Sequence, residues 1–235
     1  METKVRRFLP ACLMLTAGFY FGGCASAELK AYRGKPFQDS VYQGGPQKIP
    51  GRVQCAYYDF GGEGVAYHNQ DTKNHGSGEL NPANGTYLNE FRMKEGISTS
   101  YTKFHSQPAI DNSPYNLVQP PEGQLYVGWT APGEWFNLTV AVEQAGVYAI
   151  DLLYTSNRGG TISLDRDGQP LVSAVSLIST STDKDPIAWR QWHHWNVMTN
   201  LAEVALPKGV SVLTLHIVTE GNMNLAYLDF EPKHK

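Results

Sequence analysis

The stretch LYVGWTAPGEWFNLTVAVEQAGVYAIDLLYTSNRGG (Leu125–Gly160) decides the fold of this chain. Two runs in it alternate apolar residues with polar or small ones, and a turn at Ala145-Gly146 separates them. The apolar positions are Phe136, Leu138, Val140 and Val142, then Tyr148, Ile150, Leu152 and Tyr154. Because successive side chains of a strand point to opposite faces, this period of two predicts two neighbouring strands that each turn one face to a core.

The same signal continues on both sides of this stretch. Ile162 and Leu164 precede Asp167-Gly168, a dipeptide typical of a hairpin turn. A late strand is indicated by alternation at Leu213, Leu215 and Ile217. No apolar stripe with helical spacing is longer than a turn or two. The pattern predicts an all-β fold, a two-sheet antiparallel β-sandwich of the jelly-roll type.

Four separated blocks of the chain carry recognisable motifs in a defined order and spacing. They are PGRVQCAYYDFGGEGVAYHNQD (Pro50–Asp71), Leu125–Gly160, WRQWHHW (Trp189–Trp195) and EGNMNLAYLDF (Glu220–Phe230). Together they resemble the family 6 carbohydrate-binding modules, lectin-like β-sandwiches with a galactose-binding-like fold that bind glycans and carry no catalytic machinery. The resemblance extends from Pro50 to Phe230.

The N-terminus is predicted to be a signal peptide, residues 1–23. Basic Lys4, Arg6 and Arg7 precede an apolar stretch, Phe8–Phe21, that is too short for a stable membrane-spanning helix. The sequence Phe21-Gly22-Gly23-Cys24 resembles a bacterial lipobox, although Phe21 departs from its usual aliphatic residue, and Cys24 would then be lipidated. The alternative is ordinary cleavage after Ala27.

The protein is therefore expected to be exported. It would be lipid-anchored to the bacterial membrane or cell surface, or else secreted or periplasmic. Residues 24–49, rich in glycine, proline and polar residues, are predicted to form a flexible tether, and residues 50–235 the module, with a long loop insertion at 72–124. The net charge of −3 and the lack of a basic stripe argue against a nucleic-acid partner.

The resemblance implies a glycan site at the rim of the sandwich. Its aromatic pair would be Trp129 together with Trp192 or, as the weaker alternative, Trp189. The closing segment would supply an amide, Asn224 or Asn222, to bond sugar hydroxyls. His68, with Tyr67 beside it, would contribute from below.

Structural roles compete with these assignments. Trp135 and Trp195 begin predicted strands and are expected in the core. For Trp129 and Trp192, the sequence is equally consistent with burial in the core and with contact with a ligand. Asn222 could simply stabilise a turn beside Gly221.

No cofactor is expected with confidence. The family often holds a structural calcium, but its ligand positions correspond here to Gln54, Ala56 and Ala226, and alanine offers no side-chain oxygen. Asp229 and Glu220 lie nearby in the sequence, which leaves calcium open. His193 and His194 are adjacent, so on an extended segment they would point to opposite faces and would not chelate a metal.

The sequence is compatible with three functions. The favoured one is non-catalytic binding of a polysaccharide or oligosaccharide at the cell surface, near separate polysaccharide-degrading enzymes. The second is a structural or protein-binding surface module. The third, a glycoside hydrolase, needs two carboxylates across a cleft, and no partner could be assigned among Glu63, Glu79, Glu90, Glu95 and Glu134.

Overall fold

The structure is a computed structural model that describes residues 32–233, so the predicted signal peptide and Cys24 lie outside it. It contains fourteen strands: β1 (Gln47–Ile49), β2 (Gly51–Gln54), β3 (Tyr67–His68), β4 (Ser77–Gly78), β5 (Asn81–Pro82), β6 (Thr99–Tyr101), β7 (Leu125–Val127), β8 (Trp135–Val142), β9 (Gly146–Ser156), β10 (Gly160–Arg166), β11 (Gln169–Leu177), β12 (Asn196–Leu206), β13 (Gly209–Thr219) and β14 (Met223–Pro232). The helical segments of this range are two short 3-10 turns, η1 (Cys55–Tyr57) and η2 (Ala188–Arg190). None of its helices is long and apolar enough to cross a membrane.

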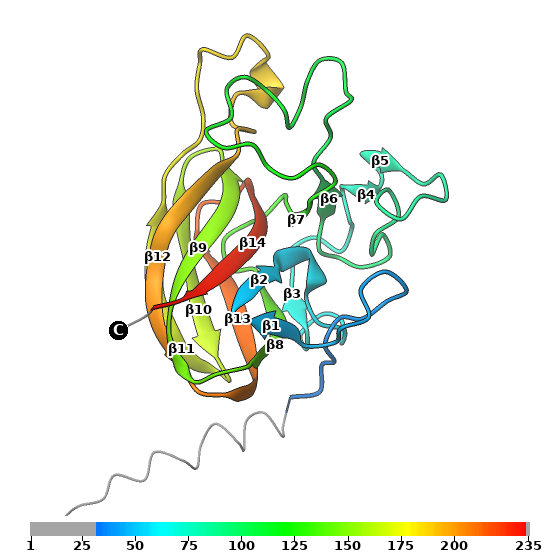
Figure 1. The fold of residues 1–235 in the computed structure, drawn as a ribbon. Helices are drawn as coiled ribbons and strands as arrows, with labels where there is room; N and C mark the ends of the chain where they lie inside the picture. The colour runs from blue at the N-terminus through cyan, green and yellow to red at the C-terminus, as the bar shows by residue number, and fades with distance from the viewer. Residues whose placement is uncertain (1–31, 234–235) are drawn as a thin grey trace, which may run out of the picture.

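Most strands form two six-stranded sheets that face each other (Figure 1). The first has the order β1-β8-β13-β10-β11, with β3 also paired to β8. The second has the order β12-β9-β14-β7-β6, with β2 also paired to β14. Pairing within both sheets is antiparallel except between β1 and β8, which run parallel. The predicted all-β sandwich is therefore confirmed.

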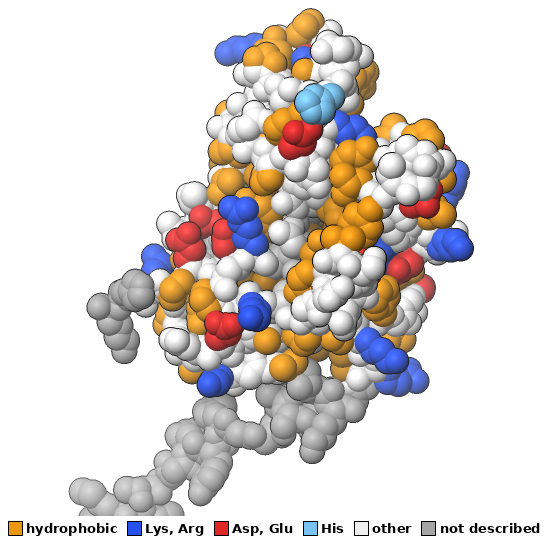
Figure 2. Space-filling view, turned by 45° about the vertical axis from the view of Figure 1, so that its right-hand side comes forward, with side chains coloured by type: hydrophobic (Ala, Val, Ile, Leu, Met, Phe, Trp, Pro, Cys, Tyr) orange, Lys and Arg blue, Asp and Glu red, His pale blue; other side chains and the backbone are white. Residues whose placement is uncertain are grey.

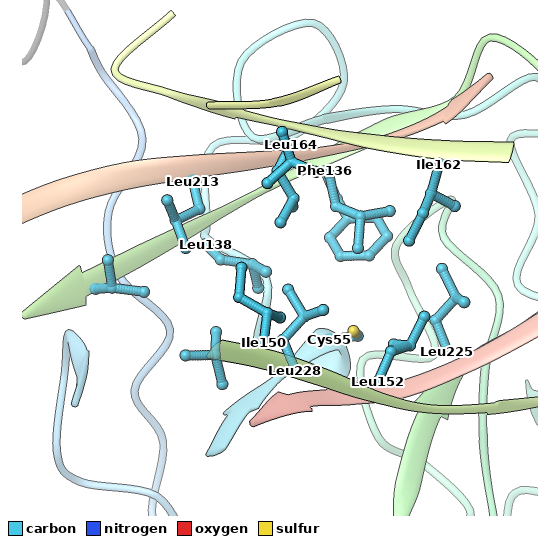
Figure 3. Packing of buried hydrophobic residues seen from close by; sticks show 14 of the residues in the cluster. Cys55, Phe136, Leu138, Ile150, Leu152, Ile162, Leu164, Leu213, Leu225 and Leu228 are labelled. Carbon is cyan, nitrogen blue, oxygen red and sulfur yellow. The ribbon is translucent and has the colours of Figure 1, made fainter. Parts of the chain in front are cut away.

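The main core lies between the two sheets (Figure 3). Alternate residues of β8, β10 and β13 meet alternate residues of β9 and β14 there. The buried side chains include Phe136, Leu138, Leu164, Leu213, Ile150, Leu152 and Leu228. This packing follows from the period of two in the sequence, because each strand can bury only one of its faces in the core.

A second apolar cluster lies on the outer face of the second sheet. Leu153 and Tyr227 are a cross-strand pair on β9 and β14, and the next pair, Leu152 and Leu228, belongs to the main core. Trp195 is fully buried against this outer face, and Val118 of the insertion packs beside it. This part of the outer face is thus covered by Trp195 and by Val118 of the insertion rather than left to solvent.

A third cluster ties the N-terminal segment to the module. Phe37 is buried, and its ring stacks with Tyr57 at a centroid distance of 4.9 Å. Residues 32–49 of the predicted tether are therefore packed on the sandwich, and they supply β1. The reason is the aromatic content of this segment, because Phe37 and Tyr42 bury large apolar surfaces without needing a regular period.

The 72–124 insertion is folded around polar side chains. Asn74 is buried, and its Oδ1 accepts hydrogen bonds from the backbone N–H groups of Gly76, Ser77 and Thr99 at 3.0–3.1 Å. The short strand β6 joins this segment to the second sheet through β7. Regular alternation is absent because side-chain hydrogen bonds, rather than a long ladder, fix the backbone here.

Cys55 lies in η1, directly after β2. It is fully buried in the main core, and burial raises the pKa of its thiol. It therefore acts as a small apolar residue of the core, since a buried thiol with a raised pKa is unreactive.

Candidate functional site

A pocket of about 520 Å³ opens at one end of the sandwich, where loops of the second sheet meet the insertion. It is lined by Trp129, Trp189, Trp192, Tyr126, His193, Asn222, Asn224, Leu80, Lys103, Ile110 and Asp111. In Figure 2, hydrophobic side chains gather along a hollow in the upper half of one face of the molecule. Five of the seven residues assigned to the glycan site from sequence, namely the three tryptophans and the two asparagines, are thus brought to one pocket.

Trp129 follows β7 and reaches the pocket through an unusual backbone conformation. Its φ is +53°, a value that bulky residues rarely adopt, and its side chain remains 39% exposed. An outlier of this kind persists only where its surroundings fix it, and such residues cluster at functional sites. Gly76 of the insertion lies behind the ring, since a Cβ at that position would be 3.2 Å from Trp129 Cζ3.

The loop before β14 is locked to the loop that carries Trp129. Asn222 donates its N–H to the carbonyl of Thr130 at 2.8 Å, and the Thr130 hydroxyl accepts from the N–H of Met223 at 3.0 Å. Asn224 is only 2% exposed and donates from Nδ2 to Thr155 Oγ1 at 2.9 Å. A side chain on Gly128 would clash with Asn224 Oδ1, which lies 2.7 Å from the position of a Cβ. The pocket therefore receives Asn222 from a preorganised loop and Asn224 from the start of β14.

The loop between β11 and β12 carries the other two tryptophans. Trp189, in η2, is 54% exposed, and Trp192 stacks on His193 with a centroid distance of 5.6 Å. The loop is held by Asp185, whose carboxylate accepts two hydrogen bonds from Arg190, at 2.6 and 2.9 Å. The hydrogen bonds from Arg190, with help from His194, hold the pKa of Asp185 well below its usual range although burial opposes them.

Arg190 also connects this loop to the insertion. Its guanidinium donates to the carbonyl oxygen of Ala109 and is buried with Asp185. The two segments lie side by side at the top of Figure 1. A buried arginine that bonds both walls of a pocket fixes their separation.

Asp111 connects the insertion to the second sheet at the pocket wall. It is 1% exposed, and its Oδ1 accepts from Trp195 Nε1 at 2.7 Å while its Oδ2 accepts from the backbone N–H of Lys103 at 2.7 Å. His193 Nε2 lies 2.8 Å from Oδ1, although the two are not aligned as a hydrogen bond. This explains why Trp195 is buried: its indole N–H has a partner that the insertion brings to it.

Tyr67 and His68 lie outside this pocket, unlike the arrangement that the resemblance implied. They form β3 at the edge of the first sheet. Tyr67 is buried in the main core, and its hydroxyl accepts a hydrogen bond from Gly96 N at 3.1 Å. His68 Nδ1 lies 2.5 Å from Glu63 Oε1. The strand that carries them pairs with β8 in the first sheet, whereas Tyr126 and Asn224 line the pocket from β7 and β14 of the second sheet.

The expectation for the two strand-initial tryptophans holds for one of them. Trp195 is fully buried, whereas Trp135 is partly exposed and lies near the His68 ring. The physical reason is the alternation along β8: Phe136 takes the core-facing position, so its neighbour must face outward.

The positions related to the family's calcium site are occupied by packing and by hydrogen bonds. Ala56 and Ala226 are fully buried in apolar clusters. Gln54 Oε1 accepts a hydrogen bond from Gln124 Nε2 at 2.6 Å. Residues 32–233 contain no group of three or more histidine, cysteine, aspartate or glutamate side chains placed to hold a metal ion.

The carboxylates near the pocket have structural partners. Glu134 is buried, where it accepts hydrogen bonds from the N–H groups of Gln70 and Ala131, and burial raises its pKa. Glu63, Glu79 and Glu95 lie within ion-pairing distance of His68, Lys73 and Arg92. Among the described pocket residues Asp111 is the single carboxylate, and a glycosidase would need two.

Sequence reasoning missed the contribution of the insertion. Leu80, Lys103, Ile110 and Asp111 line the pocket, and none of them belongs to the blocks that carried the resemblance. His193 was considered only as a metal ligand. The sequence feature that pointed to this segment was its length without strong strands, because such a segment is often part of a binding surface.

No family model matches the chain, and no curated protein sequence matches it. Several solved structures are similar in fold. A β-1,3-glucan-binding family 6 carbohydrate-binding module from Bacillus halodurans is 16% identical, with a TM-score of 0.45, over 79% of this chain and 98% of that one. A family 6 module from Clostridium stercorarium, in complex with cellobiose, is 12% identical, with a TM-score of 0.46, over 81% of this chain and 99% of that one.

A third similar structure belongs to a larger enzyme. An arabinoxylan arabinofuranohydrolase of glycoside hydrolase family 43 from Bacillus subtilis is 13% identical, with a TM-score of 0.46; the match covers 84% of this chain but only 33% of that one. The similarity thus concerns one part of that enzyme. Because these TM-scores lie below 0.5 and the identities below 25%, the function has to be argued from the pocket itself.

Proposed function

We propose that this chain is a non-catalytic carbohydrate-binding module that holds a glycan in the pocket between Trp129, Trp189 and Trp192. The observation that carries the proposal is the composition of this pocket. Three indole rings and two asparagine side chains converge on one cavity of about 520 Å³. Flat aromatic faces complement the apolar faces of pyranose rings, and amide groups bond their hydroxyls.

The preorganisation of the pocket supports binding. The segments that carry Trp129 and Asn224 are cross-linked through Thr130, and the loop that carries Trp192 is fixed by the buried Asp185–Arg190 pair. Side chains that are already held in place lose less conformational entropy when a ligand arrives. The lack of a second carboxylate among the described pocket residues supports binding without hydrolysis.

The proposed setting is the cell surface. If Cys24 is lipidated, residues 25–31 would be all that separates the anchor from the packed segment that begins at residue 32. The module would then be held at the membrane, where it could retain a polysaccharide for separate hydrolases.

Titration calorimetry of the purified protein with plant, algal and microbial polysaccharides tests the proposal. A lone pocket of this kind should bind with a Kd of roughly 10 μM to 1 mM. Trp129→Ala and Trp192→Ala should each weaken binding at least about tenfold, because each removes an aromatic platform. Asn224→Ala should cost about 1–3 kcal/mol of binding free energy.

Trp135→Ala is the matched control, since it removes a partly exposed indole from outside the pocket. It should bind glycan like the unmodified protein. Unchanged affinity of both Trp129→Ala and Trp192→Ala for a confirmed glycan, with melting temperatures intact, would contradict the proposed site.

A further inference from the structure

Lys103 lines the pocket, and neither the fold nor the packing explains why a charged side chain stands there. It follows β6 in the insertion, and its backbone N–H is fixed by Asp111 Oδ2 at 2.7 Å. Its ammonium group lies 4.9 Å from the centroid of the Tyr101 ring. No carboxylate of residues 32–233 lies within ion-pairing distance of it. Burial lowers the pKa of Lys103, and the nearby Asp111 opposes that effect.

The carboxylate beside Lys103 is buried and accepts hydrogen bonds from the protein. Asp111 is 1% exposed, and its two oxygens accept hydrogen bonds from Trp195 and from the Lys103 backbone, with His193 close by. A carboxylate that is buried and bonded in this way offers little of its charge to a ligand. The ammonium of Lys103 is therefore the accessible charge of the pocket.

Lys103 also lines a second, smaller hollow of about 330 Å³, together with Tyr101, Phe104, His105 and Glu122. The carboxylate there, Glu122, lies 2.9 Å from His105 Nε2. Lys103 thus belongs to the walls of two adjacent hollows, and in each the carboxylate has a partner of its own. A saccharide that extends from the pocket toward the smaller hollow would pass this ammonium group.

We propose that the pocket is selective for an acidic saccharide, whose carboxylate or sulfate group pairs with Lys103 while a neighbouring ring contacts the tryptophans. This inference rests on the proposed glycan binding and adds the chemical class of the ligand to it. A partly desolvated ammonium without an ion-pair partner gains a charge-assisted hydrogen bond from an anionic ligand, whereas a neutral hydroxyl offers a weaker one.

The test compares acidic saccharides with their neutral counterparts by titration calorimetry. The probes are oligogalacturonate and its methyl ester for the carboxylate, and a sulfated galactan oligosaccharide and its desulfated form for the sulfate. The protein should bind at least one acidic probe about tenfold more tightly than the neutral form of the same probe, and the preference should shrink as salt is raised.

Lys103→Met keeps the aliphatic stem and removes the charge. It should abolish the preference for the acidic form, while Lys103→Arg should retain the preference. Lys48→Met is the matched control, because Lys48 is an exposed lysine on β1, 3.6 Å from Glu143. It should behave like the unmodified protein.

Equal affinity for acidic and neutral forms, or a preference that survives Lys103→Met, would overturn this inference while leaving glycan binding intact. Failure of every saccharide to bind would overturn the proposed function as well. The two failures are thus distinguishable by whether the neutral probes bind.

Discussion

At the scale of single residues, the pocket depends on positions where the backbone has no room for a side chain. Gly128 leaves space for Asn224, and Gly76 lets the insertion approach β6 and the Trp129 ring. The glycines themselves make no contact with a ligand. Their role is to bring polar and aromatic groups from distant parts of the chain within reach of one another.

Gly76→Ala should destabilise the protein and weaken the pocket. A Cβ at this position would lie 1.9 Å from the carbonyl oxygen of Thr99, which is backbone and cannot rotate away. We expect a loss of roughly 1–3 kcal/mol of unfolding free energy, typical of overpacking, measured by urea denaturation.

Gly146→Ala is the control for this substitution. The nearest atom to its Cβ would be Tyr148 Cε2 at 3.8 Å, an ordinary contact, and the residue is exposed at the start of β9. If the Gly76→Ala protein is as stable as the Gly146→Ala protein, Gly76 does not approach the Thr99 carbonyl closely.

At the scale of elements, the loop between β11 and β12 owes its shape to one buried ion pair rather than to regular structure. Asp185 and Arg190 are both buried, and His194 Nε2 lies 3.0 Å from the same carboxylate. Removal of one partner from such a pair leaves an uncompensated charge, which typically costs about 3–5 kcal/mol. The loop that presents Trp189 and Trp192 is therefore tied to the stability of the module.

This pair predicts a loss of stability in acid. The pKa of Asp185 is lower in the folded protein than its unfolded value near 3.8, so the folded state binds fewer protons. The carboxylate therefore stabilises the fold above this pH, and the contribution is lost as the pH falls below it. The melting temperature should decline below about pH 4, and Asp185→Asn should be less stable at pH 7 with a shallower decline in acid.

Asp183→Asn, a change to an exposed carboxyl on the same loop, serves as the comparison. Its melting temperature should follow that of the unmodified protein at every pH. If Asp185→Asn follows it too, the Asp185 carboxylate does not stabilise the folded state.

At the scale of the whole molecule, apolar contacts and hydrogen bonds hold the sandwich together at the positions that the sequence resemblance relates to a calcium site. Gln54 is bonded to Gln124, and Ala56 and Ala226 are fully buried. We expect a chelator such as EDTA to shift the melting temperature by less than about 1 °C. A calcium ion at 100 times its Kd would contribute about 2.7 kcal/mol, so a clear drop in melting temperature would show that other oxygens hold a metal.

Anchoring is also a property of the whole molecule. Cys24→Ser should move the exported protein from the membrane fraction to the soluble fraction, because a lipidated N-terminal cysteine carries the two-chain anchor that stable attachment requires. Cys12→Ser, which changes a cysteine within the predicted signal peptide, should leave the distribution unchanged. A distribution between the fractions that Cys24→Ser leaves unchanged would favour ordinary cleavage after Ala27.

The sequence by itself determined the sandwich and most of the pocket's aromatic residues. Alternation at Phe136–Val142 and Tyr148–Tyr154 is a local property, and a strand with a period of two can bury only one face. The same rule, applied strictly, would have placed Trp135 on the outside. The order of the four blocks also led to Trp129, Trp192 and Asn224, three residues that the structure brings to one pocket.

Only the tertiary structure decided what surrounds those residues. Phe37 and the insertion pack through aromatic and polar side chains without a repeating period, so no pattern in the sequence locates them. Asp111 and Trp195 meet across a long stretch of chain, and Lys103 enters the pocket because Asp111 holds its backbone. Contacts of this kind depend on which loops the folded sheets bring together, and this is why the charge of the pocket could not be read from the sequence.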